Sequence, residues 1–439
     1  MKDNGNSADK SGQIDVKINE GFYFDRTLDL PTVIKEYGRV ERILRELNYL
    51  ACITVQVVDL SKVEYQYGSN SYNYLLSRIT EALKRIKDRE FRGQDIFVVD
   101  LYDADTFVIF LSPPRDDKTK LIYHLEPISE RIRIALEDEV FELLHPYLKR
   151  ATRPNIGYAI EINNPMVNNM RLVRQLVRSS KRMGEFMAAK RDCSSRYNLQ
   201  KLIIERDLQT VFQPIVDMHT LEVIGYEALS RGPVGTEFHN PTMLFLLAAE
   251  SGLSFELDRV CRKLAFKRVG DIDTDKKIFV NTLGMTIHDP EFRGMYLKEL
   301  LEDMKVKPQN VVFEISEKLA IDNYDLFRSA MQDYTDIGIV HAGDDVGTGY
   351  SGLERIMELN PGYMKVDMAF AKNIDKSFIK QQIIKALVHL GRNINSSIIV
   401  EGIETREEYE KLKELGVPYG QGFLFARPSN TLGDINRDF

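Results

Sequence analysis

Acidic and amide side chains recur at the ends of short apolar runs in the second half of this chain of 439 residues. Burying several carboxylates together is costly unless cations neutralise them. Hard oxygen ligands with an amide and without a thiolate favour Mg²⁺ or Mn²⁺. Adjacent aspartates suit two ions about 3.5–4 Å apart, which stabilise the attacking and leaving oxygens of a displacement at phosphorus. The residues at these positions are Glu227, Asn281, Glu314, Asp344, Asp345, Lys365, Asp367, Glu401 and Gln421.

Each of these residues taken alone also fits a simpler interpretation. A polar group at the end of a strand often caps the helix that follows it, and for a single residue that interpretation is favoured. The complete set favours a metal site, because capping does not require several carboxylates to gather in one place. The stretch 343–349 is not a phosphate-binding P-loop, since it lacks the Gly-Lys-Ser/Thr ending and contains two acids.

The runs that would position these side chains alternate with longer amphipathic segments. Repeated strand and helix units over about 240 residues are typical of a (β/α)8 barrel, an α/β fold. Parallel strands in such a barrel bring their carboxyl ends to one face, where the active site lies. The sequence therefore predicts one pocket that collects these side chains. The predicted strands are Val223–Leu229, Ile278–Leu283, Val311–Ile315, Ile337–Ala342, Tyr363–Val366, Ile398–Glu401 and Gly422–Phe425.

Segments in this half of the chain resemble the EAL family, in the right order over about Asn198 to Pro428. The resemblance implies a TIM-like barrel that hydrolyses cyclic di-GMP to linear pGpG, by in-line attack of water activated by two Mg²⁺ or Mn²⁺ ions. It also implies a homodimer formed through the barrel. The matching segments are Phe212–Val216, Tyr226–Arg231, Phe279–Asn281, Glu314–Glu317, Asp344–Ser351, Lys365–Asp367, Glu401–Glu404 and Gln421–Leu424.

The same resemblance implies a role for each matching residue. Lys365 would orient or deprotonate the attacking water, Glu317 would hold the loop after the aspartate pair, and Arg231 would bind a substrate phosphate, which suits its planar guanidinium. The implied metal ligands are Glu227, Asn281, Glu314, Asp344, Asp345 and Glu401. The implied catalytic residues are Lys365, Glu401, Asp367 and Glu317, and the implied substrate contacts are Arg231, Gln213, Leu229, Glu404 and Gln421.

Two positions depart from the family pattern. Val346 stands where the family usually has an aromatic residue, and Gly362 stands where an Asp often precedes the Tyr and the catalytic Lys. Neither is a metal ligand in the implied assignment, so we expect reduced or retuned activity at most.

The first half of the chain resembles the GGDEF cyclase family in outline. Strand-like runs at Cys52–Val58, Ile96–Leu101, Thr106–Leu111 and Ile156–Ile160 alternate with helical patterns, which predicts an α+β domain. Asp59 stands where the family has its first metal aspartate. The two glycines of the name-giving hairpin are replaced by Asp103 and Ala104. A charged side chain there would block a triphosphate, so we expect a scaffold, a dimerisation module or a nucleotide-sensing domain that is not a cyclase.

Composition restricts the classes of function. The net charge of −7 argues against a nucleic-acid polymer as partner. Three isolated cysteines, Cys52, Cys193 and Cys261, predict reduced thiols. The polar N-terminus and the absence of a long apolar run predict a cytoplasmic protein without membrane insertion.

The sequence predicts four parts. They are a flexible arm at 1–32, a degenerate GGDEF-like domain at 33–190, a linker at 191–197 and the EAL barrel at 198–439. The leading hypothesis is hydrolysis of cyclic di-GMP. One alternative is a receptor that binds cyclic di-GMP without efficient turnover and signals through the first domain. A barrel that serves only as a scaffold is the third possibility.

Overall fold

The computed structural model describes residues 22–100, 105–112, 121–272, 275–316, 324–346, 361–433, 435–437 and 439. The chain divides into two compact units, Met1–Ser194 and Ser195–Phe439. Each unit has its own sheet and its own hydrophobic core, and each is described separately below.

The first unit contains a four-stranded antiparallel sheet in the order β4-β5-β3-β6. All four strands predicted for this region are present, with ends that differ by a few residues. The strands are β3 (Tyr49–Gln56), β4 (Ile96–Val99), β5 (Thr106–Phe110) and β6 (Asn155–Ile162). The helices are α1 (Val33–Leu47), α2 (Leu60–Tyr67), α3 (Ser69–Glu90), α4 (Leu121–Leu148) and α5 (Asn169–Glu205).

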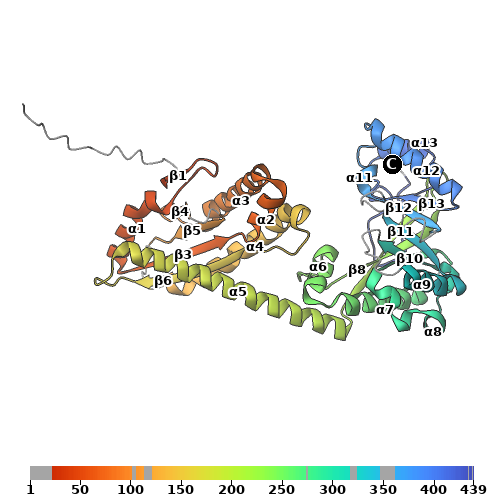
Figure 1. Ribbon diagram of the computed structural model, residues 1–439, viewed down its shortest axis with the longest axis horizontal. Coiled ribbons are helices and arrows are strands. Elements are labelled where there is room, and N and C mark those ends of the chain that lie inside the picture. The colour runs from red at the N-terminus through yellow and green to blue at the C-terminus, as the bar shows by residue number, and fades with distance from the viewer. Residues whose placement is uncertain are drawn as a thin grey trace, which may run out of the picture. The chain divides into compact units, whose positions relative to one another are not determined.

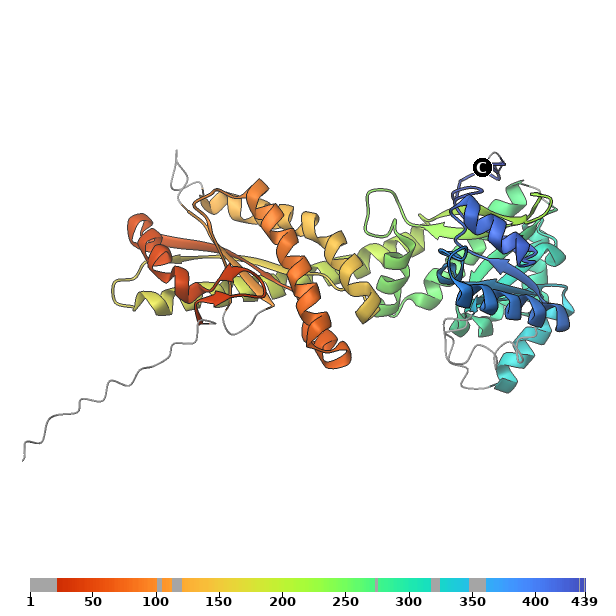
Figure 2. The same cartoon turned by 90° about the horizontal axis from the view of Figure 1, so that it is seen from above.

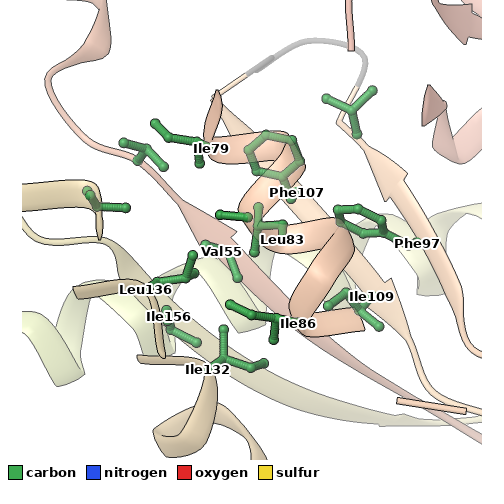
Figure 3. Close-up of a cluster of buried hydrophobic side chains, with 14 of the residues drawn as sticks. Val55, Ile79, Leu83, Ile86, Phe97, Phe107, Ile109, Ile132, Leu136 and Ile156 are labelled. Atoms are coloured by element: carbon green, nitrogen blue, oxygen red, sulfur yellow. The ribbon is translucent and has the colours of Figure 1, made fainter. Parts of the chain in front are cut away.

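Alternating residues of the central strand β3 pack into two cores, one on each face of the sheet. Ile53 and Val55 belong to the core formed with α3 and α4 (Figure 3). Leu50 and Cys52 belong to the opposite core, which α1 and α5 cover. The unit is therefore a sheet buried between two layers of helices, as its continuous apolar strands require.

Part of the predicted flexible arm, 1–32, is folded. Residues 1–21 lie outside the described residues, but the segment that follows is folded onto the first unit. Strand β1 (Phe24–Asp25) pairs with β2 (Leu30–Pro31), and Leu28 is buried in the core beside α3. Two leucines in a polar context carry too weak a pattern to predict this packing.

The predicted linker 191–197 is not a break in the structure. These residues lie within α5, and the boundary between the two units falls at Ser194 inside this helix. Arg191–Arg196 contains neither Gly nor Pro, so nothing in it ends a helix. Leu199 is buried on the second unit, and it extends the apolar side of the same helix.

The second unit is a closed eight-stranded barrel in the order β10-β11-β12-β13-β14-β7-β8-β9, which confirms the predicted fold (Figure 1). Its helices surround the strands, as the green to blue part of Figure 2 shows. The strands are β7 (Gln209–Asp217), β8 (Val223–Arg231), β9 (Lys277–Thr282), β10 (Val311–Ser316), β11 (Val340–Val346), β12 (Tyr363–Val366), β13 (Ser397–Val400) and β14 (Tyr419–Gly420).

Longer helices follow most strands, and shorter helical turns connect them. The longer helices are α6 (Pro241–Ser251), α7 (Ser254–Ile272), α8 (Gly294–Asp303), α9 (Tyr324–Asp336), α12 (Phe378–Asn393) and α13 (Arg406–Glu414). The short helices are η2 (Gly284–His288), η3 (Pro290–Phe292), η4 (Pro308–Asn310) and α11 (Met368–Ala371).

The barrel departs from the sequence prediction in three places. Strand β7 runs antiparallel to both of its neighbours, β8 and β14. The predicted strand Gly422–Phe425 is wrong, because these residues form a turn in which Gly422 oxygen accepts from Phe425 nitrogen at 3.2 Å. A Cβ atom on Gly422 would lie 2.0 Å from the carbonyl oxygen of Ile403, so this glycine serves close backbone packing. Strand β11 also begins three residues later than predicted and includes the aspartate pair.

Among the described residues, no helix is both long and apolar enough to cross a membrane.

Candidate active site

Lys365 on β12 is the centre of the site, and its side chain is only 1% exposed. Its Nζ atom lies 2.7 Å from Glu314 Oε1 on β10 and 2.6 Å from Glu401 Oε1, directly after β13. Glu227 Oε2 on β8 lies at 3.2 Å and Asp344 Oδ1 on β11 at 3.7 Å. Four carboxylates, carried by β8, β10, β11 and the residue after β13, therefore converge on one ammonium group.

Two side-chain amides also hydrogen-bond to the carboxylate of Glu227. Asn281 Nδ2 donates to Glu227 Oε1 at 3.0 Å, and Gln421 Nε2 donates to Glu227 Oε2 at 2.8 Å. Gln421 Nε2 also lies 3.1 Å from Gln213 Oε1, and Gln213 donates to the carbonyl of Ala426 at 3.1 Å. The barrel thus joins β7, β8, β9 and the segment after β14 through a chain of side-chain hydrogen bonds.

Strand register explains why side chains distant in sequence meet. In the parallel ladders, Glu314 on β10 lies opposite Asn281 on β9, and Ser316 on β10 lies opposite Asp344 on β11. Glu401 follows β13 and donates its backbone nitrogen to the carbonyl of Val366 at 3.0 Å. Because successive side chains alternate between the two faces of a strand, these pairings place the acids at one level inside the barrel mouth.

Burial and neighbouring charges shift the pKa values of three of these acids in different directions. Burial, with the charges of Glu227 and Asp344, raises the pKa of Glu314 well above its usual range, although Lys365 opposes the shift. Burial likewise raises the pKa of Glu401 to about 8, against the opposing attraction of Lys365. Burial would also raise the pKa of Glu227, but Lys365, Gln421 and Asn281 outweigh it and lower the pKa.

Lys365 itself is held protonated. Burial would lower its pKa, but the surrounding carboxylates raise it well above the usual lysine value, with Glu227 and Glu314 contributing most. One ammonium group cannot neutralise four carboxylates, so the site carries an excess of negative charge when all of them are ionised. Burial is the main cause of the raised pKa values of Glu314 and Glu401, and this excess of negative charge adds to it.

The residues present fit divalent cations in chemistry and charge. The donors are carboxylate and amide oxygens without a thiolate, as Mg²⁺ and Mn²⁺ prefer. Apart from Lys365, no hydrogen-bond donor among the described residues faces either buried oxygen of Glu314. The carboxylates are arranged around the ammonium group of Lys365, and in the described part of the chain no group of three or more His, Cys, Asp or Glu side chains is already placed to hold a metal ion.

Other predicted site residues lie in different surroundings. Asp367 caps α11 and accepts from the nitrogen of Ala369 at 2.7 Å, as the simpler capping interpretation predicts. The side chain of Glu404 is exposed to solvent. Glu317 lies outside the described residues, and so does the side chain of Asp345.

Leu229 and Arg231 are both half-buried near the carboxyl end of β8. Arg231 Nη1 donates to the carbonyl of Ser230 at 2.8 Å. Burial lowers the pKa of Arg231, although Glu227 opposes the shift.

The two departures from the family pattern are buried or close-packed. Val346 is buried at the end of β11 in the core beside α12 and α13. A Cβ atom on Gly362 would lie 2.6 Å from Val340 Cγ1, so a larger residue there would require Val340 to move.

Two exposed apolar side chains near the strand ends were not predicted. Met368 follows β12, and its Cβ atom would lie 2.3 Å from a Cβ on Gly402, next to Glu401. Phe423 follows β14, and the guanidinium of Arg427 lies 4.2 Å from its ring centroid. The available signal was an apolar residue one or two positions after a strand-end polar residue, which is too common to identify a site.

The fold and the site together define a TIM-like α/β barrel with an acidic site at the carboxyl ends of its strands. The EAL domain family model matches residues 196–428, more than half of the chain, and the chain belongs to this family. Similarity to solved structures agrees on the fold. The FimX EAL domain of Xanthomonas citri has a TM-score of 0.52 at 16% identity, covering 56% of this chain and 98% of that chain.

Relatives in Escherichia coli strain K12 match the same half. The oxygen sensor protein DosP is 28% identical over 243 residues, which cover 52% of this chain and 29% of DosP. The cyclic di-GMP phosphodiesterase PdeR is 30% identical over 237 residues, which cover 53% of this chain and 35% of PdeR. The chain thus spans well under half the length of these relatives.

Proposed function

We propose that the barrel hydrolyses cyclic di-GMP to linear pGpG. The observation that carries this proposal is the convergence of Glu227, Glu314, Asp344 and Glu401 on Lys365 at the carboxyl ends of the strands. Membership of the EAL family supports the choice of substrate, and so does the 30% sequence identity to PdeR, a cyclic di-GMP phosphodiesterase. Such a site suits phosphodiester hydrolysis, in which negative charge develops on the transferred phosphoryl group.

In this proposal, the residues of the barrel hold the metal ions and orient the attacking water. Glu227, Asn281, Glu314, Asp344, Asp345 and Glu401 would hold two Mg²⁺ or Mn²⁺ ions, which would stabilise the attacking and leaving oxygens. Lys365, held protonated and aimed by its carboxylate neighbours, would orient the attacking water and stabilise developing negative charge. Gln213 and Gln421 keep Glu227 in place.

Arg231 would bind a phosphate of the substrate, and Leu229 and Glu404 would contribute to the wall of the binding site. Glu317 would support the loop after β11, and Asp367 would act at the edge of the metal and water network. The exposed ring of Phe423 offers apolar surface to a base.

The decisive experiment follows conversion of cyclic di-GMP to pGpG by chromatography, using the full chain with Mg²⁺, with Mn²⁺ and with a chelator. We expect metal-dependent turnover that falls by at least ~100-fold in Glu227→Ala, because the substitution removes a ligand that three neighbouring groups orient. Glu222→Ala is the matched control, since Glu222 is an exposed carboxylate before the start of the same strand. Absence of turnover in the unsubstituted chain would refute the proposal. Binding that survives chelation without hydrolysis would instead indicate the receptor function.

We also propose that the first unit is a degenerate GGDEF-like domain that regulates or dimerises the protein and is not a cyclase. Asp59, at the position of the family's metal aspartate, pairs with Lys62 at 2.6 Å and with Arg150 at 3.0 Å. Asp105 accepts a hydrogen bond from the hydroxyl of Tyr72. These internal partners compete with a metal ion for the same carboxylates.

The replaced hairpin residues, Asp103 and Ala104, lie outside the described residues. We expect no cyclic di-GMP from GTP, measured by the same chromatography. If the unit binds a nucleotide, GTP should change the rate of cyclic di-GMP hydrolysis without being consumed.

A homodimer through the barrel is the remaining proposal. Helix α12 exposes Phe378 and Ile379 at 71% and 72%, and Met368 on the neighbouring α11 is also exposed. Exposed apolar side chains gathered in one place commonly mark an interface. Sedimentation should show a dimer that Phe378→Asp converts to monomer, whereas Ile204→Asp on α5 should leave it intact. A monomer at micromolar concentration in the unsubstituted chain would count against this proposal.

A further inference from the structure

Ser195 connects helix α5 to the loop that follows strand β8. Its Oγ atom donates to Glu237 Oε1 at 2.6 Å, and the serine is buried. Glu237 is half-buried and lies between β8 and α6. A hydrogen bond from a buried hydroxyl to a carboxylate is stronger than one between neutral groups, so this contact can hold the loop against α5.

The loop behind Glu237 is closed at its base. The backbone nitrogen of Gly232 donates to the carbonyl of Phe238 at 3.1 Å, and Phe238 is buried. A Cβ atom on Gly232 would lie 2.4 Å from that carbonyl oxygen, so the two chain segments touch directly. The first and last residues of the loop 232–238 are therefore held together by a backbone hydrogen bond. Arg231 directly precedes this loop.

Helix α5 is anchored within each unit by separate contacts. In the first unit, Ser180 pairs with Thr54 at 2.9 Å, and a Cβ atom on Gly157 of β6 would lie 1.9 Å from the carbonyl oxygen of Ser180. In the second unit, Leu199 and Leu202 are buried. These two leucines hold the part of α5 that carries Ser195 in place within the second unit.

We propose that Ser195 and Glu237 are positioning residues for Arg231, and that their hydrogen bond sets the affinity for the substrate phosphate. The inference rests on the proposed function, because it assumes that Arg231 binds a phosphate of cyclic di-GMP. The hydrogen bond fixes Glu237, the closed loop fixes Gly232, and Gly232 limits the backbone of its neighbour Arg231.

The test measures KM and kcat for cyclic di-GMP in the full chain carrying Glu237→Ala or Ser195→Ala. We expect KM to rise roughly 3-fold to 10-fold, the effect of one hydrogen bond of ordinary net strength, while kcat changes less than about 2-fold. Glu237→Gln keeps an oxygen acceptor and should restore most of the affinity. In an Arg231→Ala background, Glu237→Ala should raise KM no further, because the pair acts through Arg231.

A second readout does not depend on activity. Amide hydrogen exchange over residues 231–238 should become faster in Glu237→Ala and stay unchanged in Glu222→Ala, the exposed control before the start of β8. Unchanged exchange and unchanged KM would overturn the inference, and so would an additive effect in the Arg231→Ala background. If the unsubstituted chain does not turn over cyclic di-GMP, the proposed function fails, and the exchange measurement still decides whether the pair holds the loop.

Discussion

Replacing Lys365 by methionine removes the ammonium group that faces four carboxylates. The four oxygens lie between 2.6 and 3.7 Å from Nζ, and the lysine side chain is 1% exposed. Removing one partner of a buried ion pair leaves an uncompensated charge and costs about 3–5 kcal/mol. We expect Lys365→Met to lower the free energy of unfolding of the metal-free chain by an amount in that range when the carboxylates are ionised.

The cost should depend on pH, and the raised pKa values give its sign. An acid whose pKa is higher in the folded state than in the unfolded state stabilises the fold at low pH, and this contribution disappears as pH rises through the folded value. Burial raises the pKa of Glu401 to about 8 and raises the pKa of Glu314 well above its usual range. Without Lys365 both acids become still harder to ionise. Glu227 keeps a lowered pKa and stays ionised near about pH 5, so part of the cost remains there. The destabilisation should therefore be smaller near about pH 5 and larger near about pH 9.

The assay is urea unfolding followed by circular dichroism, with metal removed by a chelator, at both pH values. Lys411→Met is the matched control, because Lys411 pairs with the exposed Glu414 on the surface of the same unit and such pairs contribute little. Divalent cations should reduce the loss in Lys365→Met by neutralising the carboxylates it leaves behind. A cost that is equal at both pH values, or no larger than that of Lys411→Met, would refute the charge argument.

Three further predictions follow from single positions. Glu314→Gln should leave the metal-free chain as stable or more stable in urea unfolding near neutral pH, whereas Glu227→Gln should destabilise it, because only the second acid is held by several donors. Gly422→Ala should lower the free energy of unfolding by about 1–3 kcal/mol through overpacking, while Gly433→Ala, with open space around it, should have little effect. Burial lowers the pKa of His341, so its contribution to stability is complete above about pH 6.5 and is lost as pH falls below that value, with a slope that His341→Gln should remove.

The barrel and the approach of Glu227, Glu314 and Lys365 to one another could be predicted because their signals are local and regular. Glu227, Glu314 and Lys365 each end or nearly end a short apolar run, and parallel strands must bring such ends together. The direction of β7 could not be predicted in this way, since an antiparallel strand has the same alternation of apolar residues as a parallel one. The turn at Gly422 was missed for a related reason. Its apolar neighbours resemble a strand, and only the contact with Ile403 shows that the glycine is needed for backbone packing.

Residue type alone also could not show whether an acid after a strand faces the site or caps the next helix. Asp367 follows its strand as closely as Glu401 does, yet its carboxylate caps α11 while Glu401 contacts Lys365. The difference lies in the backbone after each strand: a helix begins at once after Asp367, so its side chain meets an unsatisfied backbone nitrogen. After Glu401 comes Gly402, with a φ of 69°, and no helix begins until Arg406. The conformation of the following residues therefore decides whether a strand-end acid faces the site.

Two glutamates in similar sequence positions have pKa values that are shifted in opposite directions. Glu227 is a fixed anion, because Lys365, Gln421 and Asn281 lower its pKa against the cost of burial. Glu314 is buried more completely and faces Lys365 as its only donor among the described residues, so its charge depends on a nearby cation. A site built only from acids like Glu227 would not need a metal, and one built only from acids like Glu314 would not hold its charge without one. Their combination keeps the site assembled in the metal-free state while leaving carboxylate oxygens that a divalent cation can neutralise.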